Sequence, residues 1–164
     1  IKWINRILSW EPNARIVLHG VSMGAATVLM ASGEDLPGNV KAVIADCGYT
    51  SEWDEFQREA DTLHIPWFPV LNATSVLSKV RDGYDFKQAS ALAQVKKSRI
   101  PTLFIHGSSD ELVPYSMLGE LYAAAACEKE ELTVEGAGHA LSSSVAPTLY
   151  WRTVENFIAK YLDR

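Results

Sequence analysis

The segment from Gly20 to Gly24 reads GVSMG, with a serine flanked by glycines two positions before and after it. It follows an apolar run, residues 15–19, and precedes a helical pattern, residues 23–32. A serine between a strand and a helix lies on a very tight turn, where small neighbours leave room for the backbone. This context predicts that Ser22 is an exposed nucleophile and that the backbone N–H of Met23 faces the developing oxyanion.

A serine hydroxyl needs a base that accepts its proton, and the base needs a partner that orients it. Asp110 follows the apolar run 102–106 in HGSSD, and His139 follows the run 131–135 in GAGH. In open α/β sheets, functional side chains gather at the carboxyl ends of the strands. The order Ser, Asp, His therefore predicts a catalytic triad of Ser22, Asp110 and His139.

Other titratable residues compete for these roles. Asp46 ends the run 40–46 and is the alternative acid, although capping a turn is the simpler role for it. His19 and His106 lie beside glycines at strand ends, where hydrogen-bonded structural histidines are expected. His64 lies far from both strand ends and is expected to be solvated or to contact a lid.

Four apolar or β-branched runs alternate with helical patterns along the chain. The runs cover residues 15–19, 40–46, 102–106 and 131–135, and the helical patterns cover 23–32, 114–127 and 145–162, with Pro114 as a first helical residue. This alternation predicts one α/β domain over residues 1–164, with a parallel sheet in sequential order and helices on both faces. The fourth run is more polar than the others, which suits a sheet edge.

Residues 48–99 form a longer connection than a strand crossover needs. A long insertion of this kind is either an active-site lid or extra packing, and an aromatic-rich lid over Ser22 would suit an apolar acyl or alcohol group. A carboxylic ester is therefore the expected substrate, with a peptide or amide bond as the alternative. The residues expected to contact the substrate are Trp53, Phe56, Trp67, Phe68 and Val113.

The bulk composition is that of a folded protein, with 48% hydrophobic and 21% charged residues. The net charge of −5 and the absence of a basic block argue against nucleic acid as the main partner. Cys47 and Cys127 are too few and too widely spaced for a disulfide framework or a zinc site, so Cys47 is expected to be a buried free thiol. The proposed chemistry requires no metal ion and no organic cofactor.

Three stretches resemble known segments of the α/β-hydrolase superfamily, especially its bacterial esterase-like and peptidase-like members. IVLHGVSMGAATVLMASG, IPTLFIHGSSDELVPYSM and VEGAGHALS are similar to the nucleophile-elbow, acid-loop and histidine-loop segments. The resemblance implies that Ser22 is the nucleophile, His139 the general base and then acid, and Asp110 the residue that orients His139. It also implies an oxyanion donor at the Met23 amide and a lid at the position of residues 48–99.

A complete α/β-hydrolase has about four further strands before the elbow strand, and one of their loops supplies a second oxyanion donor. The sequence is therefore expected to be the C-terminal half of such an enzyme. The edge of residues 15–19 would then be covered by a second copy of the chain or by the N-terminal half. The sequence leaves the compartment undetermined between the cytoplasm and a membrane anchor in an N-terminal region outside this chain. The alternative of another class is a non-catalytic fragment that acts as an interaction module.

Overall fold

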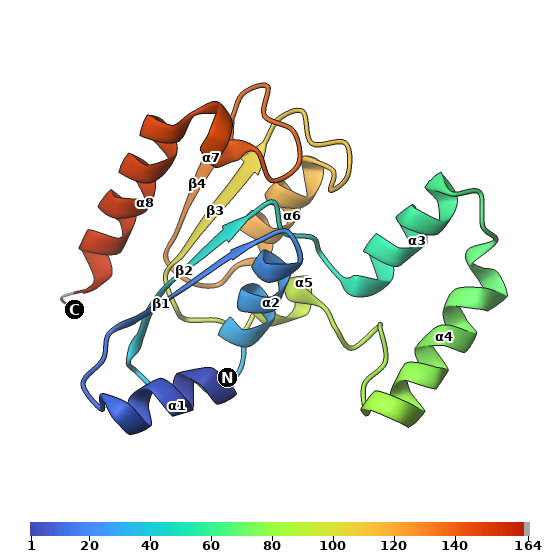
Figure 1. Ribbon diagram of the computed structural model, residues 1–164, viewed down its shortest axis with the longest axis horizontal. Helices are drawn as coiled ribbons and strands as arrows, with labels where there is room; N and C mark the ends of the chain where they lie inside the picture. The colour runs from blue at the N-terminus through green and yellow to red at the C-terminus, as the bar shows by residue number, and fades with distance from the viewer. Residues whose placement is uncertain (163–164) are drawn as a thin grey trace.

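The computed structural model describes residues 1–162 and contains one parallel sheet of four strands (Figure 1). The strands are β1 (Ile16–Val21), β2 (Val40–Asp46), β3 (Thr102–Gly107) and β4 (Lys129–Val134). Their order is β1-β2-β3-β4, and every neighbouring pair is parallel. The predicted α/β architecture and sequential strand order are confirmed, and the polar β4 lies at a sheet edge as expected.

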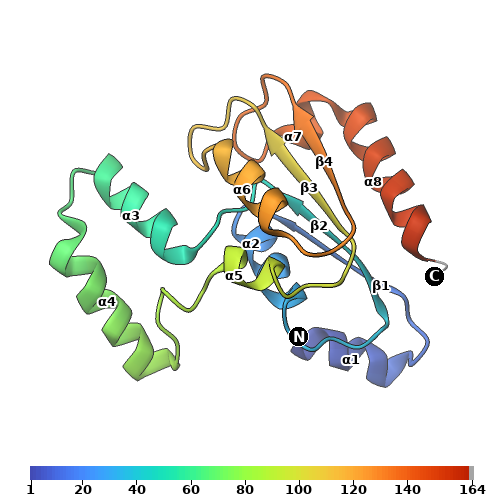
Figure 2. The same cartoon turned by 180° about the vertical axis from the view of Figure 1, so that it is seen from behind.

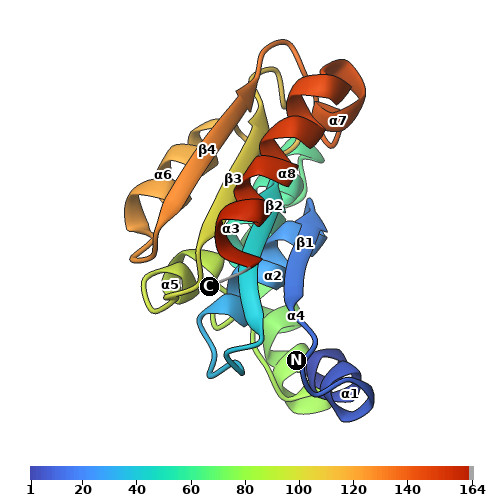
Figure 3. The same ribbon diagram turned by 90° about the vertical axis from the view of Figure 1, so that its left-hand side faces the viewer.

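Helices cover both faces of the sheet (Figure 3). Alternate residues of β2 point to opposite faces, so Val43 and Ala45 enter one core and Ala42 and Ile44 the other. On the first face the strands pack against α2 (Met23–Ser32), α5 (Ala91–Val95) and α6 (Ser116–Ala124). On the second face they pack against α8 (Pro147–Leu162), which contributes the fully buried Tyr150 and Phe157.

Two predicted helices have different bounds in the structure. The helix expected to begin at Pro114 begins at Ser116, because residues 111–115 form a turn in which the Pro114 carbonyl accepts the Met117 amide. The pattern 145–162 divides into α7 (Ser142–Val145) and α8. Ala146 separates the two helices with φ −131° and ψ 61°, since a residue before proline disfavours the helical region.

Residues 48–99 fold as α3 (Glu52–Thr62), α4 (Trp67–Asp82) and α5. Figures 1 and 2 show that α3 and α4 form a helical pair that extends away from the sheet, whereas α5 returns to α2. The Ser51 side chain caps α3 by accepting the Asp54 amide, and Gly83 ends α4 at φ 85°. A further helix, α1 (Lys2–Trp10), packs Ile4 near the start of β1.

Within residues 1–162, none of the helices combines the length and the apolar composition that crossing a bilayer requires.

A buried polar network joins β2 to the C-terminal helices. Asp46 is 1% exposed, and its Oδ1 accepts the Ser142 hydroxyl at 3.1 Å. The Tyr150 hydroxyl also bonds to Asp46 and lies 3.1 Å from Nε2 of His19. Burial raises the pKa of Asp46, and the hydrogen bonds from Ser142 and Tyr150 only partly oppose this rise.

β1 and α2 approach each other so closely that only glycine fits at position 20. A Cβ atom at Gly20 would overlap the carbonyl group of Gly24, whereas a Cβ at Gly24 itself would meet no atom within 4 Å. We therefore expect Gly20→Ala to lower the free energy of unfolding by about 1–3 kcal/mol, as overpacking against backbone does. Urea unfolding would measure the loss, with Gly24→Ala as the matched control. Equal stability of the two variants would contradict this assignment.

The pKa of Asp46 also predicts how stability depends on pH. Because this pKa is raised on folding, the contribution of Asp46 to stability is complete below its unfolded pKa and is lost as pH rises through the folded value. Asp46→Asn keeps the shape but removes the titration. The quantity to compare is the unfolding free energy of the wild type minus that of Asp46→Asn. We expect this difference to be smaller at about pH 7 than at about pH 4. Urea unfolding at both pH values tests this, and a constant or growing difference would contradict it.

Candidate active site

Ser22 is the single residue that connects β1 to α2, and its backbone is strained. It adopts φ 55° and ψ −118°, a conformation that non-glycine residues rarely hold. Two backbone hydrogen bonds fix this conformation: the Ser22 amide donates to Asp46 at 2.8 Å, and its carbonyl accepts the Ala26 amide at 3.1 Å. The strained backbone of Ser22 agrees with the very tight turn that the sequence predicts between strand and helix.

The side chains of Ser22, His139 and Asp110 form one hydrogen-bonded chain. Nε2 of His139 lies 2.7 Å from Oγ of Ser22, and Nδ1 lies 2.8 Å from Oδ2 of Asp110. An ionised carboxylate only accepts hydrogen bonds, so Nδ1 carries the proton and Nε2 is free to accept the Ser22 hydroxyl proton. The structure thus brings together the three residues of the predicted triad, with one partner at each ring nitrogen of His139.

The Asp110 side chain is fully buried, and its carboxylate accepts three hydrogen bonds. Oδ1 accepts the Leu112 amide at 3.0 Å and the Val113 amide at 2.9 Å. Oδ2 accepts from His139 and lies 3.2 Å from Nε2 of His106. These donors compensate the desolvation of a buried charge and fix the plane of the carboxylate.

His106 is a hydrogen-bonded buried histidine, as expected, but its partners include the proposed catalytic acid. Its Nε2 lies 3.0 Å from the Val113 carbonyl oxygen, in addition to its contact with Asp110. The Val113 side chain is 1% exposed and packs with Ala26 and Met117, so its position does not fit the predicted substrate contact. Val113 instead holds Asp110 and His106 through its backbone.

The competing acid and histidines lie elsewhere. The Asp46 carboxylate bonds to Ser142 and Tyr150, not to His139. His19 contacts Tyr150, and His64 is exposed and contacts the carbonyl of Asp61.

Cys47 is part of this site, and sequence reasoning missed it. The thiol is free and 1% exposed, and its sulfur lies within 4.8 Å of ligand atoms of Asp110 and His139. The backbone amides of Ala140 and Ser22 face the sulfur, but burial dominates and raises the pKa of Cys47 to about 12. Cys47 and Ala140 have φ 47° and 58°, so three of the non-glycine residues with left-handed backbone converge here. The one available signal was the position of Cys47 directly after β2.

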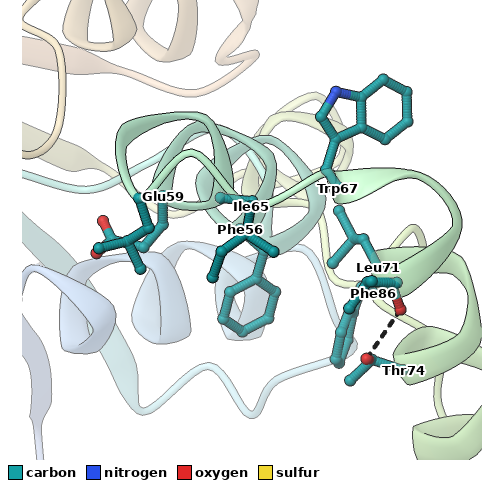
Figure 4. Close-up of a pocket in the computed structure, with 10 residues that line it drawn as sticks. Phe56, Glu59, Ile65, Trp67, Leu71, Thr74 and Phe86 are labelled. Carbon is teal, nitrogen blue, oxygen red and sulfur yellow. Dashed lines mark hydrogen bonds between the residues drawn. The ribbon is translucent and has the colours of Figure 1, made fainter.

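The aromatic residues expected to bind substrate do not form one cluster. Phe56 and Trp67 line a hollow of about 250 Å³ between α3 and α4, together with Leu63, Ile65, Leu71 and Phe86 (Figure 4). Trp53 lies at a separate hollow, where the ammonium of Lys87 sits 4.4 Å from its ring centre, and Phe68 is 67% exposed. Neither hollow is lined by Ser22, Asp110 or His139.

The start of α3 nevertheless lies within electrostatic reach of the proposed triad. Burial raises the pKa of Glu55, and the charge of His139 is among the weaker influences that lower it. Glu55 also lies 3.6 Å from Arg58 on the same helix. The link between the insertion and His139 is therefore electrostatic, and the hollow between α3 and α4 is lined by none of the three residues of the proposed triad.

Solved structures share this fold at low sequence identity. An esterase of Pyrococcus furiosus matches 98% of the chain with a TM-score of 0.72 and 21% identity, and the chain covers 60% of that structure. The esterase domain of a Rhodothermus marinus protein matches 96% with a TM-score of 0.64 and 20% identity, with 65% of that structure covered. An acylaminoacyl peptidase of Pyrococcus horikoshii matches 98% with a TM-score of 0.67 and 18% identity, with 27% covered.

The proteins related to this chain by sequence are longer than the chain itself. The uncharacterized protein YqkD of Bacillus subtilis is 32% identical over 98% of the chain and 54% of its own length. The α/β-hydrolase domain-containing protein WAV2 of Arabidopsis thaliana is 31% identical over 90% of the chain and 48% of its own length. The chain thus spans about half the length of these relatives. The sequence profile of the prolyl oligopeptidase family matches residues 8–164. The chain therefore belongs to the prolyl oligopeptidase family, within the α/β-hydrolase superfamily.

Proposed function

We propose that this chain carries the catalytic triad of a serine hydrolase that cleaves carboxylic esters. The observation that carries the proposal is the hydrogen-bonded chain from Ser22 through His139 to Asp110, with distances of 2.7 and 2.8 Å. The buried carboxylate fixes the histidine tautomer, and the elbow presents the serine oxygen to the histidine. This arrangement supports the proposal, because nucleophilic catalysis by serine requires a base at the hydroxyl and a carboxylate that orients the base.

The reaction proceeds through an acyl-enzyme. Nε2 of His139 takes the Ser22 proton while Oγ attacks the ester carbonyl carbon, and Asp110 stabilises the imidazolium that forms. The oxyanion faces the Met23 amide, which begins α2 and has no acceptor within the helix. His139 then gives its proton to the leaving alcohol, and the C–O bond breaks. A water molecule that loses its proton to His139 releases the acid and restores Ser22.

An ester is preferred over a peptide because the aromatic and apolar side chains of residues 48–99 suit an apolar acyl or alcohol group. We propose that this segment is a lid, since Glu55 of α3 lies within electrostatic reach of His139. Peptide or amide hydrolysis is the second candidate. It is favoured by the family match and by the similarity to an acylaminoacyl peptidase, because the same triad serves both bonds.

Triad variants of the complete protein test the proposal. We expect Ser22→Ala to abolish hydrolysis of p-nitrophenyl esters without changing the circular dichroism spectrum. Asp110→Asn should lower kcat by about 10⁴, because His139 then adopts the wrong tautomer. Labelling of Ser22 by a fluorophosphonate probe should be lost in Ser22→Ala. The control is Ser144→Ala, an exposed serine in α7.

Near-normal turnover of both triad variants would remove the triad hypothesis. Faster turnover of aminoacyl-anilides than of esters would instead favour a peptidase. If the probe does not label Ser22 in the folded complete protein, the chain is better explained as a non-catalytic interaction module.

We further propose that the outer edge of β1 is an internal interface of the whole protein. Within residues 1–162, β1 pairs only with β2, and an unpaired edge is a template for another strand. Val21 on β1 is 41% exposed, and Trp151, whose ring lies 6.2 Å from that of His19, is 48% exposed. The relatives are about twice as long as the chain, so the remainder of the polypeptide is the proposed partner.

This interface predicts how the 164-residue chain behaves alone. We expect it to elute above its monomer mass in size-exclusion chromatography, because copies pair along β1. We also expect ester turnover about 10²–10³ below that of the complete protein, the loss typical of a missing oxyanion donor. Supplying the preceding part of the protein as a second polypeptide should restore both. A monomer with the turnover of the complete protein would contradict the proposed interface.

A further inference from the structure

Three side chains of the kinds that bind transition metals meet beside Ser22. One ligand atom each from Cys47, Asp110 and His139 lies within 4.8 Å of the other two. We propose that these residues form a binding site for a thiophilic divalent cation, with Zn²⁺ as the expected ion, and that the bound cation holds the enzyme in an inactive state. The binding part of this proposal stands on geometry alone, whereas the inhibition part rests on the function proposed above.

The ligand set suits zinc. Thiolate, imidazole and carboxylate bind Zn²⁺ at about 2.0–2.3 Å, and three protein ligands leave a fourth position open. A tetrahedral centre separates such ligand atoms by about 3.3–3.6 Å. Nδ1 of His139 and Oδ2 of Asp110 are 2.8 Å apart, so modest side-chain movements bring all three ligands into range. One thiolate, one carboxylate and one neutral imidazole also balance the charge of the ion.

The hydrogen-bond donors around the proposed ligands also favour the metal-bound state. Asp110 is held by the Leu112 and Val113 amides, and neither donor needs to leave when a cation binds. The Ala140 amide faces the sulfur of Cys47 and would donate to its thiolate. Such outer hydrogen bonds orient metal ligands and stabilise their charged forms. His139 is partly exposed, with a side-chain exposure of 20%, which gives the ion an approach from solvent.

Metal binding and catalysis exclude each other at His139. On binding, the Cys47 thiol releases its proton to solvent and its sulfur lone pair forms the bond to the metal. If the cation takes Nε2, the lone pair that accepts the Ser22 proton is used. If it takes Nδ1, the ring proton moves to Nε2, which then donates to Ser22 and cannot act as a base. Both arrangements stop the first step of the proposed reaction, and removal of the metal reverses the block.

Cadmium titration of the reduced complete protein tests the binding site directly. Cd²⁺ shares the thiolate preference of Zn²⁺, and its bond to sulfur has an ultraviolet charge-transfer band. We expect one Cd²⁺ per chain to produce this band in the wild type and in Cys127→Ala, the matched control for the second free cysteine. Cys47→Ser and Cys47→Ala should both lose the band. His139→Ala should weaken binding at least about 10-fold. Circular dichroism would verify that each variant is folded.

Turnover supplies an independent readout. Zn²⁺ should inhibit ester hydrolysis by the wild type and by Cys127→Ala, and a chelator should restore it. The same Zn²⁺ concentration should not inhibit the ester hydrolysis that the Cys47→Ser variant retains. The site is refuted if the band is absent in the folded wild type or follows Cys127. A Cys47-dependent band in a protein that hydrolyses no ester would uphold the metal site and refute the proposed function instead.

Discussion

The close approach of β1 to α2 is the constraint on which the rest of the site depends. Gly20 has no Cβ, so the strand end can lie against the carbonyl of Gly24 and a single residue can join strand to helix. That residue, Ser22, is forced into a conformation that costs about 1–3 kcal/mol. Its hydrogen bonds to Asp46 and Ala26 hold it there. The result is a serine oxygen that stands clear of the sheet at the N-terminus of α2, where His139 reaches it.

A second constraint is the burial of two carboxyl groups, Asp110 and Asp46, at the edge of the sheet where His139 lies. Asp110 and Asp46 end neighbouring strands or their loops and are both nearly inaccessible to water, but their surroundings differ. Asp110 accepts from two backbone amides and from His139, so its charge is compensated by donors fixed in the fold. Asp46 accepts chiefly from the hydroxyls of Ser142 and Tyr150, and burial raises its pKa. This difference, rather than residue type, suits Asp110 to orient a base and Asp46 to join β2 to α7 and α8.

The loops at the carboxyl edge of the sheet meet at residues whose φ angles are positive. Ser22, Cys47 and Ala140 each follow a different strand or its loop, and each has a left-handed φ. The amides of Ser22 and Ala140 turn toward the sulfur of Cys47, which places a thiol beside the histidine. The same compactness that orders the proposed triad therefore also assembles the proposed metal site.

Strand alternation, the GVSMG elbow and the order of Ser22, Asp110 and His139 were all readable from the sequence, because local spacing and strand ends determine them. The sequential sheet followed from the alternation of strands and helices along the chain. The ends of the helices were harder to predict from the sequence. Ala146 separates α7 from α8 because Pro147 follows it. The turn after Asp110 is held by hydrogen bonds from the Leu112 and Val113 amides to the Asp110 carboxylate. His106 and Val113 lie within four residues of Asp110 in the chain, and the fold of the loop after β3 decided which of their atoms meet its carboxylate. The position of Cys47 was decided by long-range tertiary structure, because only the parallel register of β2 and β3, together with the fold of the loop after β4, brings it beside Asp110 and His139. Contacts between residues so far apart in the chain leave no local pattern in a single sequence, so the sequence determined the chemistry at each strand end and the packed sheet decided which ends act together.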